Sequence, residues 1–192
     1  MRVQPAATAG PRGPWIATRT GRYYLFCPSS RDIDIETIAH ALSNQCRWSG
    51  QAAFYSVAQH SVFVSEHVPP EDALAGLLHD AAEAYVRDVP TPLKHDPAMA
   101  RFCEVEELGM RVISERFRLP WPLPESVHIA DQRACATEWR DILPPVMAAQ
   151  WVPVAQPFNA RITPWPPEEA RRRFLARFTD LFPAVPAAAV SA

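Results

Sequence analysis

The chain has 192 residues, of which 48% are hydrophobic and 21% are charged, the balance of an ordinary globular protein. Its formal net charge of −2 gives no basic footprint for a phosphate backbone, so we expect no duplex nucleic acid as a partner. No apolar run approaches the length of a membrane span, and we therefore expect no membrane partner. The four cysteines are scattered and form no Cys-x-x-Cys pair, which favours reduced thiols and a cytoplasmic location.

The length predicts one domain, which we place at residues 19–183. Residues 1–18 are rich in Pro, Gly, Ala and Thr, so we expect little order there. A flexible tail is expected at residues 184–192. Between these ends, the apolar run Tyr23–Phe26 fits either a short strand or a lid over the core.

Two helices are predicted in the first third of the chain. Asp34 has the character of an N-cap, and apolar residues follow it at helical spacing. Ser56 with Gln59 three residues later forms a capping-box pattern, which predicts a second helix that runs to about His67.

The rest of the chain also favours helices. One is predicted to begin near Glu71 and to carry His79 and Asp80 in its interior, whereas Arg87–Pro92 is predicted to be a loop because two prolines flank its threonine. A Pro-rich loop is predicted over Pro144–Pro166. Three further helices complete the pattern: one from Asp96-Pro97, one over Pro124–Ile142, and one with Ala170, Phe174, Phe178 and Leu181 on one stripe. The predicted fold class is all-α, a single helical bundle.

An adjacent histidine and aspartate, His79 and Asp80, stand out because they interrupt an apolar stretch. A buried carboxylate needs a partner, and a metal ion would satisfy both side chains at once. His60 and Asp131 share helix faces with apolar residues, so they are expected to point inward as well. Two imidazoles and two carboxylates suit one divalent transition metal ion, such as Co, Mn, Zn, Fe or Ni.

Glu83 follows these residues at helical spacing. It lies four residues after His79 and three after Asp80, which places it one turn beyond the expected metal ligands. The alternative is a solvated charge on a helix surface, but the alanines around Glu83 favour an enclosed site. We therefore expect Glu83 to act as a general acid or base.

The order of these residues resembles the HD superfamily of metal-dependent phosphohydrolases. More narrowly, the chain is similar to bacterial 5′-deoxynucleotidases. The segments that carry this similarity are Arg47-Trp48, Ser56–Ser61, His79–Glu83, Asp88–Lys94 and the distant Asp131.

The resemblance implies an HD-domain fold in which His60, His79, Asp80 and Asp131 bind the metal. It further implies that Glu83, with Asp80 at the metal, activates the attacking water. The substrate-binding roles that follow are assigned to Arg47 for the phosphate, Trp48 for the sugar and Asp88 for the 3′-hydroxyl. The implied reaction releases phosphate from a deoxynucleoside monophosphate through a metal-activated water.

A second resemblance is to small phage HD enzymes that hydrolyse dATP to the nucleoside and triphosphate. They have a helix similar to Ile38–Ser43, and in that case Arg87 and Lys94 would contact the outer phosphates. A nucleotide-binding regulatory protein without catalysis is an alternative from another class, and another phosphomonoester or a cyclic nucleotide is a third. In each case the expected partner is a small-molecule nucleotide or phosphoester, and self-association into a homo-oligomer is left open.

Overall fold

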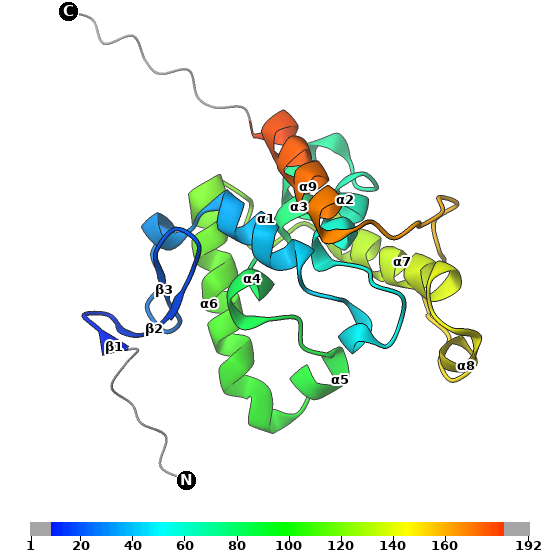
Figure 1. Cartoon of the computed structure of the whole chain (residues 1–192), viewed down its shortest axis with the longest axis horizontal. Helices are drawn as coiled ribbons and strands as arrows, with labels where there is room; N and C mark the ends of the chain where they lie inside the picture. Colours follow the sequence, from blue (N-terminus) through cyan, green and yellow to red (C-terminus); the bar gives the residue numbers. More distant parts are fainter. Residues whose placement is uncertain (1–8, 183–192) are drawn as a thin grey trace, which may run out of the picture.

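The computed structural model describes residues 9–182, and most of them are helical (Figure 1). The helices are α1 (Ile35–Ser43), α2 (Val57–Ser65), α3 (Ala73–Leu78), α4 (Glu83–Val86), α5 (Thr91–Lys94), α6 (Ala100–Phe117), α7 (Glu125–Asp141), α8 (Pro145–Ala148) and α9 (Pro167–Leu181). The strands β1 (Ala9–Gly10), β2 (Gly13–Ala17) and β3 (Arg22–Tyr24) form one antiparallel sheet in that order. The prediction of a mainly helical fold is confirmed, with this small sheet as an addition.

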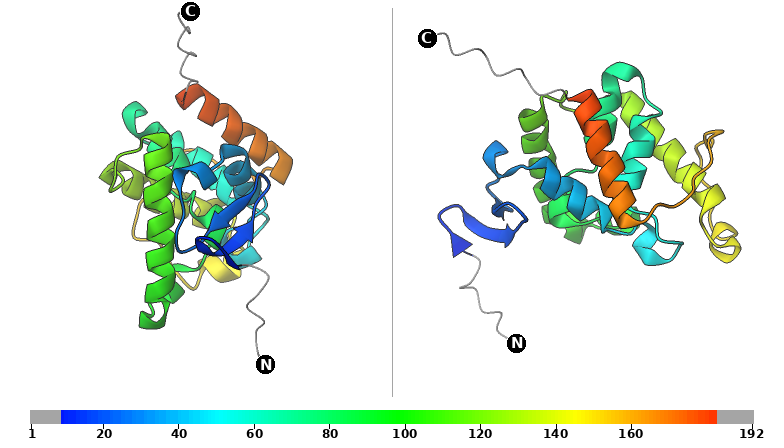
Figure 2. Two further views of the ribbon diagram at one scale, coloured as in Figure 1. Left: turned by 90° about the vertical axis from the view of Figure 1, so that its left-hand side faces the viewer. Right: turned by 45° about the horizontal axis from the view of Figure 1, so that its top comes forward.

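The centre of the molecule is α2, whose nine residues are all buried. It packs against α1, α3, α7 and α9. A helix that is enclosed on every side needs no polar face, which explains why its apolar residues follow no single stripe. The sheet and α6 lie at one end of the molecule, and α7 leads to α8 at the other (Figure 2).

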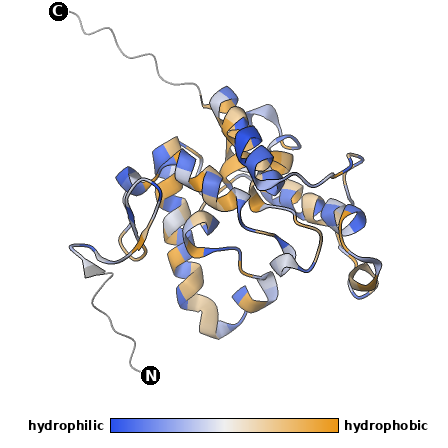
Figure 3. Ribbon diagram, in the orientation of Figure 1, coloured by the Kyte–Doolittle hydropathy of each residue, from blue (hydrophilic) through white to orange (hydrophobic). Residues whose placement is uncertain are grey.

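The last helix, α9, closes the core from outside, as its amphipathic pattern predicts. Ala170 and Phe174 are fully buried against the main apolar cluster. Hydrophilic residues of α9 face the viewer in Figure 3, where the helix crosses in front of the core. Among the described residues, no helix has both the length and the apolar character that crossing a bilayer requires.

The N-terminal expectation needs a correction. Residues 9–17 form β1 and β2, although the sequence predicts little order over 1–18. Pairing of Trp15 with Tyr24 and a bidentate ion pair from Arg12 to Asp32 hold this segment to the body. The strand alternative for the Tyr23 region is correct over Arg22–Tyr24. Residues 1–8 and the predicted tail at 184–192 lie outside the described residues.

Helix boundaries also differ from the predictions in several places. Ser56 does cap α2, but the side chain of Gln59 bonds to the backbone of Thr163 and Trp165 instead of completing a capping box. Thr91 and Pro92 open the short helix α5, so the predicted loop is shorter than expected. The predicted loop after Pro144 likewise contains α8.

The most consequential difference is that α3 ends at Leu78. His79 and Asp80 lie in the following turn rather than inside a continuous helix. The amides of Ala81 and Glu83 donate to carbonyls three residues back, so the chain keeps a tight helical path until α4 begins. The turn therefore brings two adjacent polar side chains to the same interior point.

Candidate metal centre

Four side chains from three parts of the fold meet at one point. His60 comes from the middle of α2, His79 and Asp80 from the turn after α3, and Asp131 from α7. The Nε2 of His60 lies 3.2 Å from the Nε2 of His79 and 3.0 Å from an oxygen of Asp131. An oxygen of Asp80 lies 3.2 Å from the Nε2 of His79 and 3.6 Å from that of His60.

The far side of each imidazole is fixed by an acceptor. The Nδ1–H of His60 donates to Oε1 of Glu138 at 2.6 Å, and the Nδ1–H of His79 donates to the carbonyl of Gly76 at 2.8 Å. Because these acceptors hold the hydrogen on Nδ1, the lone pair of each Nε2 faces the shared point. This is the orientation that metal ligation by histidine requires.

The charges at this point are strongly coupled. Burial disfavours a charged imidazole, but Asp80 and Asp131 outweigh it and raise the pKa of His79 well above its usual value. Burial and Arg47 also oppose charge on His60, yet Glu138 and Asp131 leave its pKa raised. Against the penalty of burial, His79 lowers the pKa of Asp80 to about 2. Both carboxylates are therefore held ionised, next to imidazoles that a cation would deprotonate.

His60, His79 and Asp131 form a group that can hold a metal ion, since one ligand atom of each lies within 4.8 Å of the others. Asp80 brings a second carboxylate oxygen to the same imidazole nitrogens. A mixed set of nitrogen and oxygen donors fits a divalent transition metal. The residues that the sequence singles out as ligands are thus brought together by the fold.

Arg47 and Trp48 lie beside this group on a short 3-10 turn, Trp48–Gly50. Trp48 and Ser49 have φ values of 58° and 51°, a left-handed conformation that is unusual for residues other than glycine. Arg47, directly before the turn, and Trp48, its first residue, both reach Glu138: the Nε of Arg47 and the indole N–H of Trp48 each donate to Oε2 at 3.0 Å. The Nη1 of Arg47 then lies 3.7 Å from Asp80.

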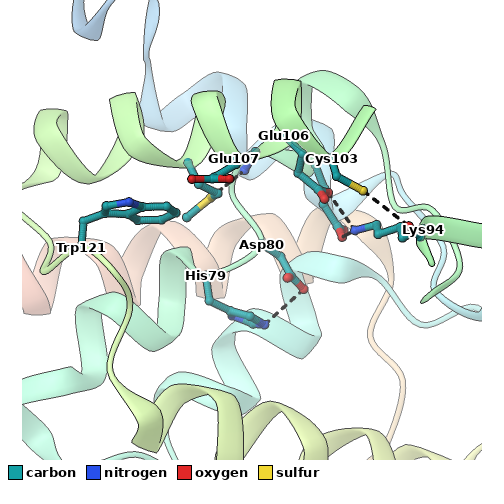
Figure 4. Close-up of a pocket in the computed structure, with 10 residues that line it drawn as sticks. His79, Asp80, Lys94, Cys103, Glu106, Glu107 and Trp121 are labelled. Atoms are coloured by element: carbon teal, nitrogen blue, oxygen red, sulfur yellow. Dashed lines mark hydrogen bonds and ion pairs between the residues drawn. The ribbon is translucent and has the colours of Figure 1, made fainter. Parts of the chain in front are cut away.

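Glu83 lies at the start of α4 and lines a cavity of about 270 Å³ next to His79 and Asp80 (Figure 4). Its side chain is only 8% exposed, and its Oε2 has no hydrogen-bond partner among the described residues. Burial, followed by repulsion from Asp80 and Asp88, raises the pKa of Glu83 to about 9. An enclosed, proton-holding carboxyl group therefore lies one helical turn from the candidate ligands His79 and Asp80.

Lys94 reaches the same cavity from α5. Its Nζ lies 2.8 Å from Glu106 on α6 and 3.7 Å from Glu83. The expected substrate-binding lysine thus forms an ion pair with Glu106 and lies near the carboxyl group of Glu83. Of the other residues of this wall, Cys103, Glu107 and Trp121 are visible in Figure 4.

Asp88 is linked to Glu83 through the side chain of Gln45. Its backbone N–H donates to Oε1 of Gln45, whose amide nitrogen donates to the carbonyl of Glu83. Burial raises the pKa of Asp88. The exposed residue Arg87, at φ 78°, directs the chain from α4 toward Asp88.

A second cavity, of about 310 Å³, lies beside Asp88, and its lining residues are Asn44, Gln45, Cys46, Ser49, Gly50, Arg87 and Asp88.

The sequence analysis misses two residues of this site, Glu138 and Gln45. Glu138 is fully buried and joins His60 to Arg47 and Trp48. The sequence feature that could have indicated a buried Glu138 is its position two helical turns after Asp131, on the helix face that also carries Val127. Gln45 has no comparable signal, because it follows the end of α1 in an irregular segment.

No family model matches the chain. YfdR, an uncharacterized protein of Escherichia coli K12, is 38% identical over an alignment of 175 positions that covers 87% of this chain and 95% of YfdR. An uncharacterized protein of Rhodobacter capsulatus is 36% identical over an alignment of 132 positions that covers 62% of this chain and 66% of that protein. Because the match to YfdR spans nearly the full length of both proteins, the chain belongs to the same family as YfdR.

Proposed function

We propose that the protein is an HD-domain metal-dependent phosphohydrolase that releases phosphate from deoxynucleoside monophosphates. The observation that carries this proposal is the meeting of His60, His79, Asp80 and Asp131 at one point beside Arg47 and Glu83. The HD resemblance in the sequence supplies the reaction class, and the geometry supplies a ligand set and a proton-carrying group next to it.

One divalent metal ion, such as Co, Mn, Zn, Fe or Ni, would be held by the two imidazoles and two carboxylates. When bound, such an ion supplies Lewis-acid activation of water and phosphate. The Nδ1 acceptors, Glu138 and Gly76, keep both imidazoles oriented for it.

The chain's own groups divide the remaining tasks. Arg47 is anchored through Nε, so its terminal nitrogens are directed toward Asp80 and can bind a phosphate there. Glu83 moves a proton at its unpartnered Oε2. The cavity beside Asp88 has room for the nucleoside, with the Asp88 carboxylate as an acceptor for the 3′-hydroxyl. The packing of Trp48 on the sugar follows from the resemblance, since the neighbouring Ser49 lines this cavity.

The charge around the cavity of about 270 Å³ favours a monophosphate over a triphosphate. Its wall contains Asp80, Glu83, Glu106 and Glu107 but only one lysine, which Glu106 already binds. Even with Glu83 protonated, and with Asp80 and His79 assigned to the metal, the carboxylates of Glu106 and Glu107 face a single lysine here. Two additional phosphates would be repelled from this wall.

The test is a product assay over a panel of deoxynucleoside mono- and triphosphates with Co²⁺, Mn²⁺ or Zn²⁺. We expect inorganic phosphate from monophosphates in the parent protein and none from Asp80→Ala. Free triphosphate as the product would replace this proposal with a dNTP triphosphohydrolase. Tight nucleotide binding without turnover, with every metal tried, would replace it with a nucleotide-binding regulator.

A further inference from the structure

Glu138 makes an unusual set of contacts for a fully buried side chain. Its Oε1 accepts a hydrogen bond of 2.6 Å from the metal-site histidine, His60. Its Oε2 accepts two hydrogen bonds of 3.0 Å, one from Arg47 and one from Trp48. One carboxylate therefore has an expected metal ligand on one oxygen and two of the expected substrate-binding residues on the other.

This arrangement is more than charge neutralisation. Arg47 alone would compensate a buried carboxylate, since a charged pair with good hydrogen bonds offsets much of the desolvation cost. The additional donors leave both oxygens of Glu138 engaged, and the two oxygens belong to one conjugated carboxylate group. A change in the hydrogen bond at Oε1 therefore alters the acceptor strength and position of Oε2.

We propose that Glu138 is a positioning residue that transmits occupancy of the metal site from His60 to Arg47 and Trp48. The inference rests on the metal site of the proposed function but not on catalysis. When a cation binds Nε2 of the neutral His60 imidazole and draws electron density from it, the Nδ1–H becomes a stronger donor to Oε1. Oε2 would then accept less strongly from the indole of Trp48, although Trp48 is not one of the candidate ligands.

Glu138→Gln separates this role from simple packing. The amide oxygen can still accept from Arg47 and Trp48, but the amide N–H₂ then faces Nδ1 of His60. Two donors cannot pair, so His60 is driven to carry its hydrogen on Nε2, the atom that must be free to bind metal. We expect Zn²⁺ affinity to fall by about 10–100-fold, the usual effect of losing such an outer partner.

The experiment follows indole N–H resonances in ¹⁵N-labelled full-length protein during titration with Zn²⁺ alone. Trp48→Phe assigns the Trp48 signal, and Trp15 on β2 serves as the internal reference. We expect Zn²⁺ to shift Trp48 but not Trp15 in the parent protein. At saturating Zn²⁺, Glu138→Gln should lose most of that shift, and long-range ¹⁵N spectra should show the changed hydrogen position on His60.

Several results would overturn the inference. One is a parent protein that binds Zn²⁺ without a shift of the Trp48 indole resonance. Another is a Glu138→Gln variant that keeps the full shift and differs from the parent only in lower stability. If Glu138→Gln does not fold, Glu138→Asp replaces it, because the shortened carboxylate cannot reach both sides and should at least halve the shift. A protein that shows the shift yet hydrolyses nothing would contradict the proposed hydrolase and leave this inference standing. A parent that binds no Zn²⁺ would overturn this inference, and one that binds none of Co²⁺, Mn²⁺ and Zn²⁺ would contradict the proposed hydrolase as well.

Discussion

The Nε2 of His60 lies 3.0 Å from a carboxylate oxygen of Asp131, and this contact joins the central helix α2 to α7. Neither α2 nor α7 carries all four candidate ligands by itself. The ligand set therefore exists only when the helices are packed, and a metal that binds it will favour the folded chain.

Removal of one ligand should abolish metal binding. We expect Asp80→Ala and His79→Ala to lose bound metal and any turnover together, because a four-ligand site tolerates the loss of one member poorly. Metal should stabilise the parent by about 2.7 kcal/mol at a concentration one hundred times Kd, and should leave the unfolding temperature of Asp80→Ala unchanged.

The matched control is His128→Ala, an exposed histidine on α7 near Asp131. It should keep both its metal content and its metal-dependent rise in unfolding temperature. Full metal occupancy in purified Asp80→Ala, measured by elemental analysis, would rule out the site as described.

Metal affinity should rise with pH. The pKa of His79 is raised well above its usual value, because Asp80 and Asp131 outweigh the penalty of burial, and that of His60 is raised too. Both imidazoles hold protons at low pH, and metal must displace them. Apparent affinity should fall by about tenfold per pH unit for each displaced proton as pH decreases below these values.

Calorimetry of Zn²⁺ binding in two buffers with different protonation enthalpies measures the released protons directly. We expect net proton release at neutral pH, decreasing as pH rises through the raised imidazole pKa values. Affinity that stays constant between about pH 6 and pH 8 would show that the histidines are not the titrating ligands.

Much of the fold follows from local sequence signals. Ser56 and Asp34 cap α2 and α1 as predicted, and α7 and α9 have the predicted apolar faces. The four candidate ligands could be chosen because a polar residue on an apolar face must point inward. Periodicity was sufficient for α7 and α9, since each buries one face, whereas the cap at Ser56 marked the start of the enclosed helix α2.

Other features depend on tertiary contacts that no local pattern encodes. No glycine or proline directly follows Leu78, where α3 ends, and in the next turn the backbone N–H of Ala82 contacts the sulfur of Met110 on α6. The strand over Gly13–Ala17 forms against β3, in a segment whose composition suggests little order. Glu138 was missed because a glutamate on a helix is usually solvated.

Arg47 should not be replaceable by lysine. The guanidinium binds Glu138 through Nε while its terminal nitrogens stay near Asp80, and an ammonium cannot do both. We expect Arg47→Lys to weaken monophosphate binding and turnover by at least about tenfold. Arg111→Lys, an exposed change on α6, is the matched control. Parent-like kinetics for Arg47→Lys on every substrate would remove Arg47 from the phosphate site.

The acidic residues that line the cavity of about 270 Å³ should determine how many phosphates a substrate can carry. Glu106 binds Lys94, so Glu106→Gln would both remove a negative charge and free a cation within the cavity. We expect the ratio of triphosphate to monophosphate hydrolysis to increase in this variant, by a factor of about ten if about 1.4 kcal/mol of repulsion is removed. Competition assays with the two substrates measure the ratio, and an unchanged ratio would show that the wall does not contact the phosphates.

Glu83 provides the sharpest test of catalysis against binding. Its side chain lines the cavity next to Asp80, its buried Oε2 has no hydrogen-bond partner among the described residues, and burial raises its pKa to about 9. Glu83→Gln keeps the size of the side chain but cannot exchange a proton, so metal content and nucleotide affinity should persist while turnover falls by about 10²–10⁴-fold. Glu104→Gln, an exposed change on α6, controls for loss of charge. Single-turnover hydrolysis and calorimetric nucleotide binding on the same preparations separate the two effects.

The Glu83→Gln substitution leaves the four candidate metal ligands in place. Unchanged turnover in this variant would therefore assign the proton transfer to another group of this site. Loss of nucleotide binding would make Glu83 a substrate ligand instead.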